Sequence, residues 1–364
     1  MSRDIVVVGG SAGGLEPLRA LVGALPSDLA AAVFVVVHGS RDTPGFLPQI
    51  LRRAGPLPAK HAVDGAVIEH GRIYVAPPDH HLLLEDGRMR VTSGPRENGF
   101  RPAVDPLFRT AAHSCGSRVI GVVLSGGLDD GTYGLSVIKQ QGGLALVQDV
   151  KEAAVPSMPA SAIRAVAVDH VLGAVALGEL IGRVAQDRVP EVVPTTKRAN
   201  GSSRDAAVAG THDLEGKRRT DPPSPFRCPD CGGALWKDGG AGLQARFTCH
   251  VGHAFSTDGL LAGHARGVET ALWVAVRALE EQAALHRRMA SRAHEGGMEE
   301  VTRSFQGKAA EAEHRARSIR RILLRQDPAV SLLPGASPAA PAARRRPIGT
   351  SRRPSAEARH STRQ

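Results

Sequence analysis

A serine, a histidine and a pair of aspartates each follow a separate apolar run of this chain. "DIVVVGG" leads into Ser11, "FVVV" into His38, and "RVIGVVLSGGL" into Asp129 and Asp130. A serine hydroxyl becomes a nucleophile when a base takes its proton, and the base is oriented by a carboxylate. These residue types therefore predict acyl transfer through a covalent intermediate, provided that the fold brings the three positions together.

The glycine-rich turn around Ser11 decides between two kinds of site. "GGSAG", from Gly9 to Gly13, matches G-x-S-x-G, in which the serine lies on a tight strand-to-helix turn beside helix N–H groups. The dinucleotide pattern G-x-G-x-x-G is not matched, because Ser11 or Ala12 stands where a glycine is required. A turn in which the serine merely caps the helix is the alternative on this stretch alone.

Alternating strands and helices position these residues in the first half of the chain. Continuous apolar runs are typical of buried parallel strands, and they lie at 4–10, 31–39, 118–127 and 143–149. Helical spacing covers 15–25 and 105–116, and "EDGR" within 72–92 predicts a hairpin. We expect a doubly wound, mainly parallel α/β sheet with an antiparallel hairpin insertion, whose strand ends meet at one edge.

Residues 1–190 resemble the catalytic domain of chemotaxis protein-glutamate methylesterases of the CheB type. The resemblance rests on "GGSAGG", "VVVHGS", "RIYVAPPDHHL", "RPAVDPLF", "GVVLSGGLDDGTYGL" and "QDVKEAAVPSMPASAI". It implies that Ser11, His38 and Asp130 form the catalytic triad, and that Asp129 occupies a variable position. Backbone donors after Ser11 and in the 126–128 loop are then expected to hold the oxyanion.

The resemblance also implies the reaction. The expected activity is hydrolysis of glutamate γ-methyl esters on chemoreceptor signalling helices, with possible deamidation of receptor glutamines and no catalytic cofactor. Expected partners are methylated chemoreceptor helices and other chemosensory proteins, such as a receptor methyltransferase or kinase. Two alternatives stay open: a serine esterase acting on another ester, and a signalling adaptor with a vestigial esterase.

Three features depart from the family pattern. Ala12 replaces a common threonine after the nucleophile, and Gly127 replaces a common methionine. The esterase strand begins at residue 4, so we expect no N-terminal receiver domain and an enzyme that is constitutive or gated by a partner.

A cluster of cysteine and histidine residues follows in the second half. Cys228 and Cys231 have C-x-x-C spacing, and Cys249 and His253 supply two further ligands four residues apart. This pattern predicts a closed, structural Cys₃His zinc site. His250 is the alternative fourth ligand. A redox C-x-x-C is less favoured, because no thioredoxin-like βαβ pattern surrounds it.

Charge and composition limit the remaining function classes. The 364 residues carry a formal net charge of +10, but residues 1–190 hold 18 basic and 18 acidic side chains. Nucleic-acid binding by that part therefore has no electrostatic support, and no nucleic-acid partner is expected. Neither a transmembrane run nor a signal peptide is visible, so we expect a cytoplasmic protein, peripheral to the membrane only through receptors. Cys115, apart from the cluster, is expected to be a buried small hydrophobe.

Composition divides the chain into five parts. We expect a catalytic domain at 1–190, a flexible linker at 191–225, a zinc-ribbon-like Cys/His module at 226–256, a helical hairpin at 257–327 and a disordered basic tail at 328–364. "EGGM" is expected to break the hairpin into two helices. The arginine-rich end is interpreted as a solvated tail, with contact to acidic receptor helices, a membrane surface or nucleic acid as the alternative.

Overall fold

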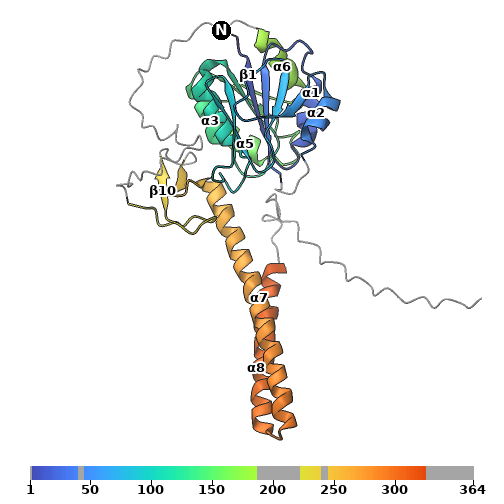
Figure 1. The fold of residues 1–364 in the computed structure, drawn as a ribbon, viewed down its shortest axis with the longest axis vertical. Coiled ribbons are helices and arrows are strands. Elements are labelled where there is room, and N and C mark those ends of the chain that lie inside the picture. The colour runs from blue at the N-terminus through green and yellow to red at the C-terminus, as the bar shows by residue number, and fades with distance from the viewer. Residues whose placement is uncertain (1, 40–44, 187–221, 239–244, 325–364) are drawn as a thin grey trace, which may run out of the picture. The chain divides into compact units, whose positions relative to one another are not determined.

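A computed structural model describes residues 2–39, 45–186, 222–238 and 245–324 (Figure 1). The predicted linker at 191–225 falls almost wholly outside the described residues, and the predicted tail at 328–364 falls wholly outside them. Across the described part, no helix combines the length and the apolar character needed to cross a membrane.

A parallel sheet forms the centre of the α/β domain, which is described over residues 2–39 and 45–186. Among the described residues, seven strands join in the order β3-β4-β2-β1-β7-β8-β9, and every pairing is parallel. The strands are β1 (Ile5–Gly10), β2 (Ala32–Val37), β3 (Ala59–His61), β4 (Arg72–Val75), β7 (Val119–Val123), β8 (Leu144–Gln148) and β9 (His170–Leu172). The predicted sheet is confirmed.

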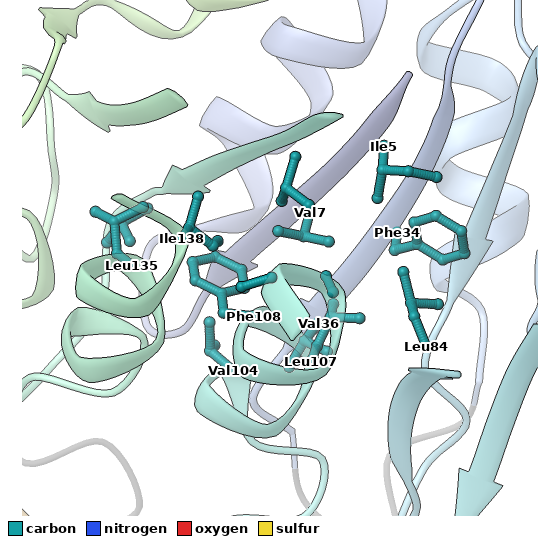
Figure 2. Packing of buried hydrophobic residues seen from close by; sticks show 14 of the residues in the cluster. Ile5, Val7, Phe34, Val36, Leu84, Val104, Leu107, Phe108, Leu135 and Ile138 are labelled. Atoms are coloured by element: carbon teal, nitrogen blue, oxygen red, sulfur yellow. The ribbon is translucent and has the colours of Figure 1, made fainter. Parts of the chain in front are cut away.

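Helices cover both faces of this sheet. One face packs against α1 (Leu15–Gly23), α2 (Leu47–Ala54) and α6 (Ala174–Gln186), and the other against α3 (Val104–Cys115), α4 (Thr132–Gln140) and α5 (Ser157–Ala165). Alternate residues of β1 serve the two faces, because successive side chains of a strand point to opposite sides. Val6 belongs to the first core, and Val7 to the second. Figure 2 shows Val7 and Val36 beside Phe108 and Leu107 of α3.

The hairpin insertion is shorter than the sequence predicted. Its strands are β5 (His81–Glu85) and β6 (Arg88–Thr92), paired antiparallel. Asp86 and Gly87 turn the chain with φ of 48° and 73°, the positive values that a tight two-residue hairpin turn requires. The beginning of the predicted segment, Arg72–Val75, instead forms β4 of the parallel sheet. The apolar run "IYVA" is too short to show from sequence that this segment belongs to the parallel sheet and not to the hairpin.

The second half contains a small sheet and two long helices. Strands β10 (Leu235–Asp238), β11 (Arg246–Cys249) and β12 (Ala254–Ser256) pair antiparallel. Helices α7 (Thr257–Glu295) and α8 (Glu299–Leu324) lie side by side (Figure 1), and the break between them falls at the predicted "EGGM". Buried alanines line both helices, and ion pairs such as Arg320 with Glu280 cross between them.

Candidate active site

Ser11, His38 and Asp130 form a continuous hydrogen-bonded chain at the carboxyl edge of the sheet. The Ser11 Oγ lies 3.1 Å from His38 Nδ1, and His38 Nε2 lies 2.7 Å from Asp130 Oδ2. The histidine and aspartate side chains are only 3% and 1% exposed. A neutral imidazole with its proton on Nε2 donates to the carboxylate and leaves Nδ1 free to accept the serine proton.

The turn that carries Ser11 is held by a second serine. The Ser11 amide donates to the Ser125 carbonyl at 2.9 Å, while the Ser125 hydroxyl donates to the Ala12 carbonyl at 3.0 Å. Gly126 follows, and a Cβ there would stand 2.8 Å from the Ser11 Cβ and 2.0 Å from the Met158 Sδ. The loop after β7 thus packs against the nucleophile turn, and only glycine fits at that point.

Strand β2 and a phenylalanine position the histidine. The His38 amide donates to the Gly10 carbonyl at 3.1 Å, which extends the pairing of β1 with β2 beyond the last strand residue. The Phe100 ring stacks on the imidazole with the ring centroids 3.9 Å apart and an interplanar angle of 6°. The ring therefore has one face covered and both nitrogens engaged.

The first turn of α3 holds the Asp130 carboxylate. The Val104 amide donates to Oδ2 at 2.7 Å, and the Asp105 amide donates to Oδ1 at 3.2 Å. Burial alone would raise the pKa of Asp130, but the hydrogen bond and charge of His38, with these two amides, outweigh burial and lower it. The free N–H groups at a helix start favour a negative charge, so this carboxylate stays ionised.

Two neighbouring aspartates differ from Asp130 in their surroundings. Asp129 accepts from the Ser256 hydroxyl at 2.7 Å, and burial raises its pKa to about 6. Asp105 accepts from the Gly134 amide at 2.7 Å, and burial together with the charge of Asp130 raises its pKa to about 8. Of the adjacent pair 129 and 130, the structure places only Asp130 against the histidine.

Backbone amides near Ser11 are candidate donors to an oxyanion. Ala12 and Gly13 lie in the turn between the nucleophile and α1, and Gly13 has a positive φ of 71°. In the 126–128 loop, the Gly126 amide already donates to the Val155 carbonyl at 2.9 Å. Gly127 and Leu128 are therefore the positions of that loop that we keep as candidates.

The Cys/His module brings its four candidate ligands together. The ligand atoms of Cys228, Cys231, Cys249 and His253 all lie within 4.8 Å of one another. The Sγ atoms of Cys231 and Cys249 are 3.7 Å apart, and the His253 Nδ1 lies 3.7 Å from the Cys228 Sγ. A tetrahedron with zinc–sulfur bonds of about 2.3 Å has edges of about 3.8 Å, so the spacing suits a zinc ion.

Two similar glycine turns present these ligands. In the first, the Gly232 amide donates to the Cys228 carbonyl at 2.8 Å, and in the second, the Gly252 amide donates to the Cys249 carbonyl at 3.0 Å. Both glycines have positive φ, of 72° and 102°. His250 is exposed and lies outside the cluster, so His253 is the fourth candidate ligand.

Sequence reasoning missed several residues of the active site. Ser125, Phe100 and Asn98, which donates to Asp130 Oδ1 at 3.3 Å, lie in loops without apolar periodicity. The sequence signal that could have found them was their position near the family motifs. Ser125 lies in "LSGG", and Asn98 and Phe100 lie in "ENGFRP", which leads into "RPAVDPLF".

Fold and site together define an α/β protein with the Ser-His-Asp arrangement that serine hydrolases use. A model of the CheB methylesterase family matches residues 6–181. A protein of Leptospira interrogans, provisionally named protein-glutamate methylesterase/protein-glutamine glutaminase, is 37% identical over 192 residues, which are 52% of this chain and 100% of that protein. The chain belongs to the CheB methylesterase family and is an enzyme of that family.

Other relatives are matched over about half of their length. Protein-glutamate methylesterase/protein-glutamine glutaminase 2 of Anaeromyxobacter dehalogenans is 39% identical over 169 residues, which are 46% of this chain and 50% of that protein. The crystal structure of the Thermotoga maritima CheB methylesterase catalytic domain is similar, with 34% sequence identity and a TM-score of 0.47. That comparison covers 50% of this chain and 99% of the other.

Proposed function

We propose that this protein hydrolyses glutamate γ-methyl esters on chemoreceptors, with Ser11 as nucleophile, His38 as general base and acid, and Asp130 as the carboxylate that orients the histidine. The observation that carries the proposal is the hydrogen-bonded chain from Ser11 through His38 to Asp130. The relatives named as methylesterases and glutaminases support the substrate class.

In the first step, Ser11 Oγ attacks the ester carbonyl carbon while His38 Nδ1 takes the hydroxyl proton. The tetrahedral intermediate carries a negative oxygen, which backbone amides of the turn after Ser11 stabilise. The C–O bond to the methoxy group then breaks. Methanol leaves with the proton that His38 returns, and the glutamyl group stays on Ser11 as an ester.

In the second step, a water molecule gives its proton to His38 and attacks the acyl carbon. The bond to Ser11 Oγ breaks, Ser11 regains its proton, and a free glutamate side chain is released. A glutamine side chain follows the same two steps with ammonia as the leaving group, which is the deamidation expected of the family. Both steps consist of acyl and proton transfer, so the mechanism uses no cofactor.

Asp130 has two tasks in this mechanism. It holds the imidazole with its proton on Nε2, and it stabilises the positive imidazolium that forms during each step. Its lowered pKa keeps it charged through the neutral range, so it never competes for the serine proton. Ala12 and Gly127 lack the hydroxyl and thioether of the usual family residues, and backbone amides alone are expected to bind the oxyanion.

We assign to the Cys/His module a structural zinc ion that is bound by Cys228, Cys231, Cys249 and His253. Four ligands close the coordination sphere and leave no position for a substrate. We also propose that the chain is divided into a catalytic domain, a linker, the Cys/His module, a helical hairpin and a tail.

The expected partners are methylated chemoreceptor helices and the chemosensory proteins around them, and the expected place of action is the cytoplasm.

Methanol release tests the proposed reaction. The purified full chain is mixed with methylated chemoreceptor cytoplasmic fragments, and methanol is measured against an unmethylated fragment. We expect release by the wild-type chain and a loss of at least about 10³-fold in kcat for Ser11→Ala. Ser117→Ala, far from the site in the turn before β7, is the matched control and should keep the wild-type rate.

Turnover of simple methyl esters with no release from receptor fragments would contradict the chemoreceptor assignment. Equal rates for wild type and Ser11→Ala would contradict the nucleophile.

A further inference from the structure

Residues 96–100 connect the triad to the Cys/His module and are not used by the mechanism above. On the triad side, Phe100 stacks on His38, and the Asn98 Nδ2 donates to Asp130 Oδ1 at 3.3 Å. Asn98 is 4% exposed and has a positive φ of 52°. Asparagine tolerates this left-handed conformation better than most residues. The segment thus contacts two of the three catalytic side chains.

On the module side, the same segment pairs with strand β12. The Asn98 amide donates to the Ala254 carbonyl at 2.7 Å, and the Ala254 amide donates to the Arg96 carbonyl at 3.3 Å. The Ser256 amide donates to the Asn98 Oδ1 at 2.8 Å. The Ser256 hydroxyl contacts the loop beside the triad as well, since it donates to Asp129.

The Asn98 amide group can satisfy both sides in only one orientation. The Ser256 N–H is a donor and needs an oxygen, whereas the Asp130 carboxylate is an acceptor and needs an N–H. Contact with Ser256 therefore fixes the Asn98 Nδ2 toward Asp130. Without that contact, only the 3.3 Å hydrogen bond to Asp130 restrains the amide group, and the side chain holds the carboxylate less firmly.

A buried ion cluster ties the same segment to both parts of the chain. Glu97 accepts from both Arg109 nitrogens, at 3.0 and 2.9 Å, and pairs with Arg246 at 2.9 Å. Arg109 belongs to α3 and Arg246 to β11. Burial alone would raise the pKa of Glu97, but the two guanidinium groups outweigh burial and lower it to about 2. Removal of one partner from a buried cluster is strongly destabilising.

The elements that make these contacts also carry the candidate metal ligands. Arg246 and Cys249 are the two ends of β11, and Ala254 directly follows His253. Strands of three and four residues bury little apolar surface, so we expect this sheet to depend for its stability on the zinc ion assigned above. Loss of that ion is then expected to loosen the strands that hold Asn98 and Glu97.

We propose that the Cys/His module is a positioning element of the catalytic site: its metal-bound form clamps residues 96–100, and Asn98, a positioning residue, transmits the clamp to Asp130. Metal occupancy then sets the turnover rate of the esterase. The proposal rests on the triad assigned under Proposed function. It extends that function, because it makes the rate of ester hydrolysis depend on whether the module holds zinc.

The clamp is tested in the full chain with changes confined to the module. Arg246→Gln combined with Ser256→Ala removes the ion pair to Glu97, the hydrogen bond to Asp129 and the hydroxyl that accepts from the Gly259 amide at the start of α7. Every triad residue stays in place. We expect kcat to fall about 10-fold with little change in KM, because misplaced groups lose rate rather than binding. Lys237→Ala, an exposed change on β10, is the matched control and keeps the wild-type kcat.

Zinc removal gives a second readout that does not depend on activity. Hydrogen exchange is followed at the peptide that contains Asn98, whose amide is buried and bonded to Ala254. Chelation should accelerate exchange there by at least about 10-fold, lower kcat to a similar extent, and be reversed by added zinc. In Asn98→Ala, chelation should lower kcat by a smaller factor than in wild type, because the transmitting side chain is gone.

Unchanged kcat and unchanged exchange after verified zinc loss would overturn the clamp, as would a rise in kcat, which would make the module an inhibitor. Failure of the proposed function is a separate result. In that case, the zinc-loaded wild type would show no Ser11-dependent methanol release. Hydrogen exchange at Asn98 would still test the zinc-dependent contact between the module and residues 96–100, because it does not depend on activity.

Discussion

The α/β domain and the Cys/His module build their sites in opposite ways. The triad joins residues 27 and 92 positions apart, and each depends on a strand of the large parallel sheet. The candidate metal site joins two tight turns whose outermost ligands are 25 positions apart, on a sheet of short strands. The first site is held by a buried core, whereas we expect the second to need the proposed zinc ion to hold its short strands together. The two regions should therefore respond to different perturbations.

Metal removal should separate the two regions most strongly. Zinc binding to small Cys/His modules supplies about 10 kcal/mol or more of folding free energy, which a sheet of this size cannot replace. Chelation should unfold β10–β12 and leave the cooperative unfolding of the α/β domain in place. Limited proteolysis checks this, with new cleavage expected in β10–β12 and protection retained in the strands of the parallel sheet. Protection of the module after zinc loss would show that its own packing suffices.

Asp130→Asn should affect the α/β domain alone. The neutral side chain no longer stabilises the imidazolium or fixes the proton on Nε2, so kcat should fall by about 10³- to 10⁴-fold. Zinc content should not change. Asp129→Asn is the matched control at the neighbouring position and should lower kcat less than 10-fold. If the two substitutions had equal effects, the assignment of Asp130 would be wrong.

Gly126→Ala and Gly307→Ala, the latter in the helical hairpin, should change the free energy of unfolding in opposite directions. The new methyl group would overlap Met158 and Ser11, so overpacking should lower the free energy of unfolding by about 1–3 kcal/mol. In Gly307→Ala, nothing lies within 4 Å of the new atom, and the helix should gain about 1 kcal/mol. Urea unfolding measures both changes. A tolerated Gly126→Ala would contradict the close approach of the β7 loop to the nucleophile.

Asp105 should give the stability of the α/β domain a pH dependence of its own. Its folded pKa of about 8 lies above the value of about 3.9 in an unfolded chain. The folded state therefore holds a proton that the unfolded state releases. The resulting stabilisation is fully present below about pH 4 and is lost as the pH rises to about 8, by up to about 1.4 kcal/mol per pH unit.

The groups that face Asp105 decide the size of this effect. Asp130 and Glu97 raise its pKa through their charges, whereas Arg109 and the Gly134 amide lower it. Asp105→Asn keeps an acceptor for that amide and removes the titration. Urea unfolding at pH 5 and pH 8 should show a smaller difference for the variant than for wild type. An unchanged difference would place the pH dependence elsewhere.

The two regions also differ in how much of them the sequence predicted. The parallel sheet and its edge were predictable, because Ser11, His38 and Asp130 follow apolar runs that became β1, β2 and β7. In the module, the spacing marked three cysteines and left His250 and His253 as alternatives, and the structure groups His253 with the cysteines. From the sequence, only the family resemblance favoured Asp130 over Asp129. The residues themselves could not decide, because the choice depends on where the first turn of α3 lies in space.

Contacts between segments far apart in sequence could not be predicted. Ser125 holds the nucleophile turn across 113 positions, and Ser256 contacts Asn98 across 158. No apolar run or regular spacing marks these residues. The edge strands β3 and β9 have three residues each, too few to show a period. Their pairing follows from the sheet that is already formed beside them.

Fluorophosphonate labelling, with the modified residue identified by peptide mass spectrometry, shows whether three distant residues form one proton-transfer chain. We expect a single label on Ser11, a labelling rate at least about 10³-fold lower in His38→Ala, and a lower rate in Asp130→Asn than in Asp129→Asn. A label on another serine, or a Ser11 label whose rate is the same without His38, would contradict it.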